Sequence, residues 1–136
     1  MVSFDYRTKI YYKDIDQMGL VYYARYFEFF EQARTELLND LGIIVSEIED
    51  EGYFLPVVSA TCEYKEGAKF EDEVIVRTII KDMPVAKLTI NYEIYRESDD
   101  HLLVKGHTIH GFIDKDGNPK RPPKSIMDKL HSLIPD

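Results

Sequence analysis

One stretch of the sequence, from Asp14 to Leu41, limits what the rest of the chain can fold into. Its first half is unusually aromatic, and its apolar side chains recur at helical spacing in two adjacent stripes: Phe27, Phe30, Leu37 and Leu41, and Tyr22, Tyr26, Phe29 and Ala33. A helix that is apolar over most of its circumference is buried. Gly42 follows the pattern and is a typical residue at a helix end. The sequence therefore predicts one long central helix that other elements must cover.

Two carboxylates, Asp14 and Asp16, and a glycine, Gly19, precede this predicted helix. The first turn of a helix has unpaired N–H groups and a partial positive charge, which can stabilise an oxygen that becomes negative. A carboxylate beside that turn can act as a base or as a nucleophile, so the two together form a minimal site for attack on a carbonyl. The simpler alternative, which the spacing alone favours, is that Asp14 or Asp16 only caps the helix.

Alternating polar and apolar residues predict strands over residues 3–13, 54–65, 73–81, 85–96 and 102–114. Pro56 places its strand end at a sheet edge or at the start of the strand, because proline cannot donate a ladder hydrogen bond. Gly106 and Gly111 indicate bulges or close backbone approaches. Short connections between the later strands favour antiparallel neighbours.

Two short helices complete the predicted order of elements. Residues 46–49 fit the capping-box pattern and predict a short helix that ends at Gly52. The tail from Ser125 to Ile134 has apolar residues at helical spacing, with Ser125 as its cap. A sheet wrapped around one largely apolar helix is an α+β layer arrangement.

Composition limits the possible functions. The chain has 136 residues, enough for a single domain over 1–136, and a formal net charge of −8 argues against binding to nucleic acid or to anionic membranes. No apolar run approaches the roughly 20 residues that span a bilayer, and the charged N-terminus is unlike a signal peptide. The single cysteine, Cys62, cannot form an intramolecular disulfide, which suits a reducing cytoplasm. We therefore expect a cytoplasmic protein without nucleic-acid or membrane partners.

Residues 11–38 carry a motif with many independent positions: paired aspartates, a glycine, an apolar pair and a series of aromatic residues that ends in Phe-Phe-Glu-x-Ala-Arg. The positions are Asp14, Asp16, Gly19, Leu20, Val21, Tyr23, Tyr26, Phe29, Phe30, Glu31, Ala33 and Arg34. This order resembles the opening motif of the hotdog-fold acyl-CoA thioesterases, specifically the 4-hydroxybenzoyl-CoA thioesterase-like group. The match spans about a fifth of the chain and is more specific than a short motif.

The resemblance implies a hotdog fold, with an antiparallel sheet of about five strands around the long helix. It implies that Asp16 is the catalytic base or nucleophile and that the backbone N–H of Tyr23 polarises the thioester carbonyl. Gly19 and Tyr26 are expected beside the substrate, coenzyme A enters only as part of that substrate, and no cofactor or metal is needed. Relatives form homodimers or homotetramers that share the site between subunits, and we expect the same here.

Other residues remain as secondary candidates. Glu31 is an alternative base, or else it pairs with Arg34 one turn further along the helix. Lys120 and Arg121, in a basic stretch that also holds Lys115 and Lys124, could bind the phosphates of coenzyme A, although the run of charges favours a solvated loop.

Histidine and cysteine give no alternative chemistry. His107 and His110 are three apart in a strand pattern, so they face opposite sides and are poorly placed to share a metal ion. Cys62 is expected to be a small core residue. Besides the thioesterase, two hypotheses stay open: a hotdog dehydratase or hydratase, which would need a histidine that the motif lacks, and a non-catalytic acyl-thioester binding protein.

Overall fold

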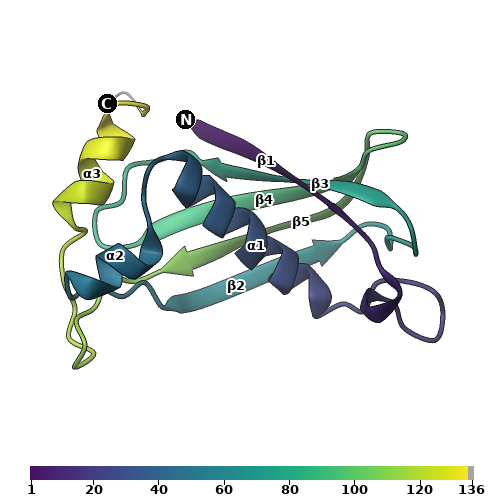
Figure 1. The fold of residues 1–136 in the computed structure, drawn as a ribbon, viewed down its shortest axis with the longest axis horizontal. Coiled ribbons are helices and arrows are strands. Elements are labelled where there is room, and N and C mark those ends of the chain that lie inside the picture. Colours follow the sequence, from purple (N-terminus) through teal and green to yellow (C-terminus); the bar gives the residue numbers. More distant parts are fainter. Residues whose placement is uncertain (135–136) are drawn as a thin grey trace.

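The computed structural model describes residues 1–134, which form a five-stranded antiparallel sheet with one long helix across one face (Figure 1). The strands are β1 (Val2–Lys9), β2 (Val57–Tyr64), β3 (Glu73–Ile80), β4 (Leu88–Arg96) and β5 (His101–His110), in the sheet order β1-β3-β4-β5-β2. The helices are α1 (Arg25–Asp40), α2 (Val45–Asp50) and α3 (Lys124–His131), and a 3-10 turn, η1 (Tyr12–Asp14), follows β1. The predicted α+β class and the antiparallel sheet are confirmed.

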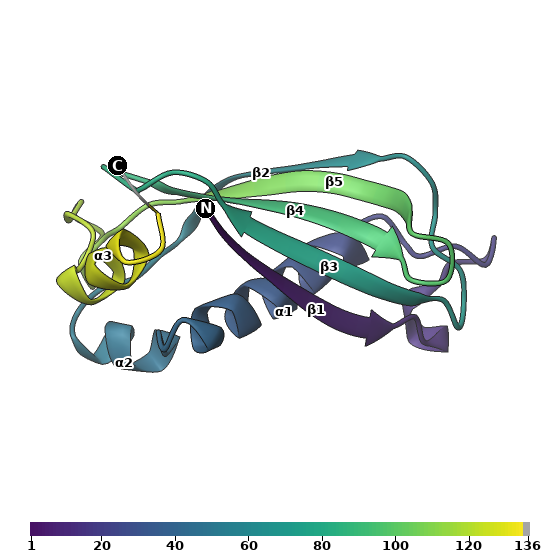
Figure 2. The same cartoon turned by 90° about the horizontal axis from the view of Figure 1, so that it is seen from above.

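The core lies between α1 and one face of the sheet, and Figure 2 shows these two layers from the side. Phe30 of α1 is completely buried and stacks on Tyr92 of β4, with ring centroids 4.2 Å apart. Gly106 of β5 lies opposite this pair, and a Cβ atom at Gly106 would lie 3.0 Å from the Phe30 ring. The close approach predicted for Gly106 is therefore confirmed, because only glycine leaves room for the aromatic ring.

Helix α1 begins later and is less enclosed than the sequence pattern predicted. Tyr22 and Tyr23 precede the helix and are exposed, and Ala24 occupies the N-cap position. One side of the helix is buried, but the side that carries Glu28 and Glu31 faces solvent. The predicted end is confirmed, since Gly42 follows the C-cap residue and adopts a φ of +76°.

Three smaller predictions were wrong at element boundaries. The first strand ends at Lys9, because the chain turns into η1. Ile44 rather than Ser46 is the N-cap of α2, and Ser46 lies inside the helix. Pro123 rather than Ser125 is the N-cap of α3, because the proline φ of −65° and an extended ψ already fix the chain for a helix start. None of the helices within residues 1–134 is long and apolar enough to cross a membrane.

The two edge strands differ in how well they are covered. Helix α1 packs over β1 and β3, so the inner face of β1 is partly buried. Strand β2 forms the other edge, next to β5 alone, and every residue of it except Cys62 is exposed. The predicted edge position next to Pro56 is confirmed, and the uncovered β2 is the main open surface of the sheet.

Candidate active site

A loop between η1 and α1 is fixed by hydrogen bonds at both of its ends. The buried carboxylate of Asp14 accepts the N–H of Tyr11 at 2.9 Å and lies 3.8 Å from the guanidinium of Arg25. The carbonyl of Asp14 accepts the N–H of Tyr22 at 3.0 Å. Asp14 is therefore a structural residue that anchors the loop, and the tip of the loop is held in one position.

Asp16 lies at the start of this tip. Its Oδ1 accepts the N–H groups of Met18 at 2.8 Å and Leu20 at 3.2 Å, and Gly19 permits the turn with a φ of +79°. The other carboxylate oxygen, Oδ2, accepts no hydrogen bond from residues 1–134. The prediction that Asp14 or Asp16 caps the long helix was wrong, because α1 begins only at Arg25 and the Asp16 carboxylate binds the amides of its own loop. One oxygen of Asp16 is thus fixed and the other is available.

Tyr23 lies between this loop and the open edge strand. No acceptor within the described part of the chain takes the Tyr23 N–H, whereas the Tyr23 carbonyl accepts the hydroxyl of Tyr64 in β2 at 3.1 Å. Burial, followed by the neighbouring Cys62 thiol, raises the pKa of Tyr64 to about 12, so its hydroxyl stays a donor. The side chains of Tyr22, Tyr23 and Tyr64 are 48%, 61% and 47% exposed. An aromatic surface with one free N–H therefore adjoins β2.

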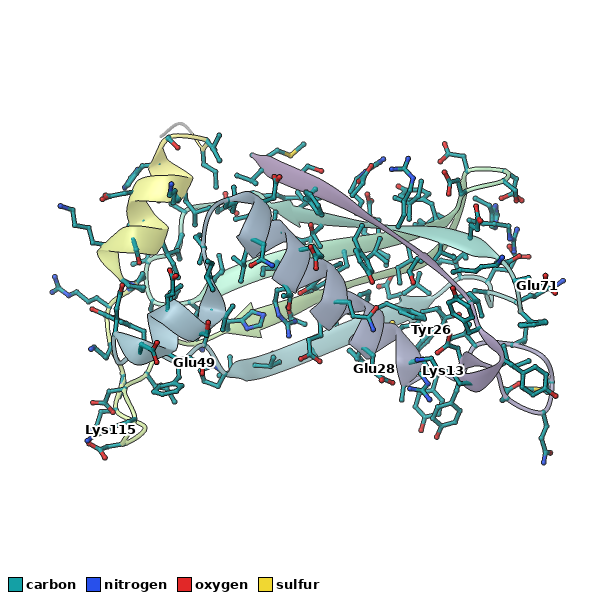
Figure 3. The ribbon with its side chains drawn as sticks, viewed as in Figure 1. Lys13, Tyr26, Glu28, Glu49, Glu71 and Lys115 are labelled. Atoms are coloured by element: carbon teal, nitrogen blue, oxygen red, sulfur yellow. The ribbon has the colours of Figure 1, made fainter. Side chains whose placement is uncertain are left out.

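Tyr26 supports the loop from beneath. Only 2% of its surface is exposed, its hydroxyl accepts the N–H of Ala68 at 3.1 Å, and Ala68 in turn accepts the N–H of Val21 at 2.9 Å. Burial raises the pKa of Tyr26. In Figure 3, Tyr26 lies at the end of α1 nearest to Lys13. Its expected contact with substrate stays a prediction, while its contacts within the chain are structural.

A cavity of about 160 Å³ lies at the other end of α1. Its walls come from α1, α2, α3, β4 and β5, and most are apolar, including Leu38, Val45, Ile48, Leu88 and Ile126. The polar residues at the cavity are Glu31, Arg34 and His110, together with Thr35. The predicted Glu31–Arg34 pair was wrong: Arg34 instead donates to the hydroxyl of Tyr92 at 3.2 Å. The reason is that Arg34 points toward the sheet, whereas Glu31 lies at the exposed side of the helix.

Arg34 starts a chain of hydrogen bonds beneath the cavity. The Tyr92 hydroxyl lies 2.7 Å from Oγ1 of Thr108, which lies 2.9 Å from Nε2 of His110, and Nδ1 of His110 lies 3.3 Å from the carbonyl of Leu55. Arg34 can only donate and a carbonyl can only accept. With a neutral imidazole the direction is then fixed, and each group between Arg34 and Leu55 accepts one bond and donates one. Burial, with the Arg34 charge second, lowers the pKa of His110 and favours this neutral form.

The unfolding free energy should fall as the pH drops below about 6.5, because the unfolded chain then binds a proton at His110 that the folded chain excludes. Between pH 6.5 and the lower pKa of His110 in the folded state, this residue makes the unfolding free energy fall by up to about 1.4 kcal/mol for each pH unit. Above pH 6.5, His110 adds no dependence of the unfolding free energy on pH. Urea unfolding between pH 5 and 8 measures the slope. His110→Gln should flatten it while His107→Gln, the matched control on the outer sheet face, should not. An equal slope in both variants would contradict the assignment.

The basic residues predicted to bind phosphate lie between β5 and α3. Nζ of Lys120 lies 3.9 Å from the ring centroid of Tyr53, and the backbone N–H of Lys120 donates to the carbonyl of Phe112. Arg121 is exposed. Figure 3 places Lys115, from the same segment, at the end of the molecule opposite to Lys13 and Tyr26. Within one chain, therefore, the structure does not bring Lys120 and Arg121 together with Asp16.

Sequence reasoning missed the cavity and the chain of hydrogen bonds below it. His110 was considered only as a metal ligand, yet both of its nitrogens are hydrogen-bonded to protein and His107 bonds Thr61 on the other face of β5. The alternation in β4 and β5 does place Tyr92 and Thr108 on the inner face of the sheet, together with His110. This shared face is the one sequence signal that could have linked the three residues. The position of Arg34 depends on the packing of α1 against the sheet, which no local pattern specifies.

A five-stranded antiparallel sheet over one long helix, with an open carboxylate in the loop before that helix, is the architecture of a hotdog-fold thioester hydrolase. This chain belongs to the thioesterase-like superfamily, whose family model matches residues 11–130. The fold, the family and the class of enzyme expected from the motif at residues 11–38 are therefore confirmed.

Individual relatives cover nearly the whole chain. The acyl-CoA thioesterase YbgC of Haemophilus influenzae is 32% identical over 134 residues, which is 96% of each chain. A hypothetical protein from Thermus thermophilus superimposes with a TM-score of 0.89 at 30% identity and covers 99% of this chain and 100% of its own. A 1,4-dihydroxy-2-naphthoyl-CoA thioesterase from Synechocystis has a TM-score of 0.89 at 22% identity, over 96% and 97% of the two chains, which shows the shared fold.

Proposed function

We propose that this protein is an acyl-CoA thioesterase in which Asp16 acts as the general base or the nucleophile. The observation that carries this proposal is the Asp16 carboxylate, whose Oδ1 is fixed by two loop amides while Oδ2 is open. The similarity to YbgC, named as an acyl-CoA thioesterase, supports the substrate class. Membership of the superfamily favours hydrolysis over the hydratase and binding-protein alternatives, and the loop from residue 11 to residue 25 contains no histidine.

Two routes fit this carboxylate. As a base, Oδ2 of Asp16 takes a proton from a water molecule whose oxygen attacks the thioester carbon; the carbon–sulfur bond breaks and the coenzyme A thiolate takes up the proton. As a nucleophile, Oδ2 attacks the carbon itself, the thiolate leaves, and water then hydrolyses the mixed anhydride. Each route consumes one water and releases an acid and a thiol. In both, the Tyr23 N–H donates to the carbonyl oxygen as it becomes negative.

The proposed active form is a homodimer, alone or within a tetramer, that pairs the β2 edges of two copies. Val57 and Val58 of β2 are 47% and 53% exposed, and an exposed apolar edge strand is a template for pairing. Antiparallel self-pairing around a two-fold axis at the middle of β2 places Tyr64 of one copy opposite the partner's Val57. Tyr23, bonded to Tyr64, then faces the partner subunit, so each site lies between two subunits.

The same pairing gives the basic segment between β5 and α3 a role. It would carry this segment of one subunit toward Asp16 of the other, although the two are far apart within one chain. Arg121→Glu should therefore raise KM for an acyl-CoA about tenfold and leave kcat nearly unchanged, because a charged contact to phosphate is lost. Steady-state kinetics with acyl-pantetheine, which lacks the nucleotide phosphates, should show no change. Lys81→Glu is the charge-matched control, and a KM effect equal in both variants would contradict the assignment.

The proposed function is tested with a panel of short, long, branched and aryl acyl-CoAs and a thiol-release assay. Turnover of one acyl class by the wild-type protein is the expected result. Acyl groups on an acyl carrier protein are included in the same panel as the alternative carrier. A folded protein that binds acyl-CoA but turns over no member of the panel would overturn the proposal in favour of a binding protein.

A further inference from the structure

A guanidinium with most of its donors unused lies at the cavity between α1 and α2. Arg34 carries five N–H donors, and among residues 1–134 the acceptor bonded to it is the Tyr92 hydroxyl. Glu31 shares the cavity mouth but is exposed and not ion-paired with Arg34. A partly buried cation beside apolar walls is normally paired with an anion. An acceptor supplied by a ligand would therefore complete the hydrogen bonding of Arg34.

The chain of hydrogen bonds below the cavity fixes Arg34 in place. The Tyr92 hydroxyl accepts a hydrogen bond from Arg34 and donates one to Oγ1 of Thr108, so the sheet side of the guanidinium is already satisfied. Arg34 also lines the cavity, so its remaining donors are within reach of a ligand bound there. A preorganised planar donor of this kind is suited to a carboxylate, which can accept two parallel bonds.

The size of the cavity limits the ligand to a short group. Its volume is about 160 Å³, and an apolar cavity of about 150 Å³ accommodates benzene. A chain of about five or six heavy atoms therefore fills it, whereas a long acyl chain does not.

The cavity of one chain is out of reach of the catalytic residues of that same chain. Tyr23 bonds to Tyr64 at one end of β2, and Leu55, at the cavity wall, precedes the other end. The seven steps from Val57 to Tyr64 span about 23 Å of extended strand. Figure 3 agrees, since Glu49 of α2 and Tyr26 lie in opposite halves of the molecule. Across the two-fold axis proposed above, Tyr23 would instead lie toward the partner's cavity.

In the dimer proposed above, the cavity of one subunit faces the thioester held by Asp16 and Tyr23 of the other. We propose that Arg34, at this cavity, selects short acyl groups that end in a carboxylate. The inference rests on the proposed thioesterase function. It assigns Arg34 a specificity role through direct contact with the far end of the acyl group. Glu31 at the mouth would favour a hydroxyl end instead, so the hydroxyl analogue is the direct competitor.

Three acyl-CoAs of matched length test this selection: glutaryl-CoA, 5-hydroxypentanoyl-CoA and 5-methylhexanoyl-CoA. The wild type should hydrolyse glutaryl-CoA with a kcat/KM at least about tenfold above the other two. Arg34→Met should lower the ratio of glutaryl to 5-methylhexanoyl kcat/KM by about tenfold to a hundredfold, since the charged contact is lost. A ratio within one variant is independent of the folded fraction. Arg77→Met, on the outer sheet face, should leave the ratio unchanged.

The outcomes separate this inference from the proposed function. If no acyl-CoA is hydrolysed, the thioesterase proposal itself fails. If acyl-CoAs are hydrolysed without preference for glutaryl-CoA, or with preference for the hydroxyl analogue, only the selection by Arg34 is overturned.

Mixed dimers test the shared site. Asp16→Asn and Arg34→Met subunits, each defective with glutaryl-CoA, should form hybrid dimers in which one site has both an intact Asp16 and an intact Arg34. Random pairing makes half of the dimers hybrid, so about a quarter of all sites should regain wild-type activity. Two differently tagged variants, co-expressed and purified in tandem, isolate the hybrid. Hybrid dimers no more active than the two parents would overturn the inference that Asp16 and Arg34 of different subunits act on the same acyl-CoA.

Discussion

Replacing Asp16 by asparagine should lower kcat for acyl-CoA hydrolysis by about a hundredfold or more, because a positioned base or nucleophile supplies a rate factor of about 10²–10⁴. The amide oxygen of asparagine can still accept the N–H groups of Met18 and Leu20, so the loop should keep its shape. The loss should therefore fall on kcat, with thermal stability unchanged. Thiol release under saturating substrate, alongside a melting curve, measures both quantities.

Two other carboxylates, Asp14 in the same loop and Glu31 in α1, serve as controls for Asp16. Asp14→Asn removes charge from a buried group paired with Arg25, so it should lower stability more than turnover. Glu31→Gln, at the exposed side of α1, should leave kcat within a few-fold. Turnover that survives in Asp16→Asn but is lost in Glu31→Gln would transfer the role of base to Glu31.

Replacing Phe30 by alanine should lower the unfolding free energy by about 3–5 kcal/mol, the usual cost of removing a large buried aromatic side chain. Phe30 is completely buried, stacks on Tyr92 and fills the space that Gly106 leaves open. The sheet cannot collapse into the resulting hole without moving β5, so little of the loss should be recovered. Urea unfolding followed by circular dichroism measures the change.

Phe70 provides the matched control, because it is 44% exposed and its ring contacts only the exposed Tyr12 among the aromatic residues described. Phe70→Ala should cost no more than about 1 kcal/mol. Losses of equal size in the two variants would show that α1 does not pack on the sheet as described.

Much of the fold could be predicted from sequence, because it depends on local patterns. Strict alternation identified β4 with its inward residues, and the aromatic stripe identified α1. The boundaries were less accurate where a neighbouring residue fixed the chain first: Pro123 displaced Ser125 as a cap, and Ile44 displaced Ser46. Tyr22 matched the helical spacing, but its N–H donates to the carbonyl of Asp14 in the preceding loop, which holds it outside the helix.

The candidate site was predictable only where it is local in sequence. Asp16, Gly19 and Tyr23 lie within one loop, so a motif could identify them, although not that the loop amides fix one oxygen of Asp16. The cavity is different, because its walls come from α1, α2, α3 and two strands. Arg34 and His110 lie far apart in the sequence and meet only through Tyr92 and Thr108.

The strand order also determines when the sheet can be completed during synthesis. Val2 pairs with Ile80, and Val57 pairs with His110, so both edge strands are made well before their partners. Only β3, β4 and β5 are consecutive neighbours and can form a meander from nearby contacts. The apolar side of α1 therefore stays exposed in a growing chain until the later strands of the sheet emerge from the ribosome. Apolar surface exposed in this way is prone to aggregation until the meander forms and covers it.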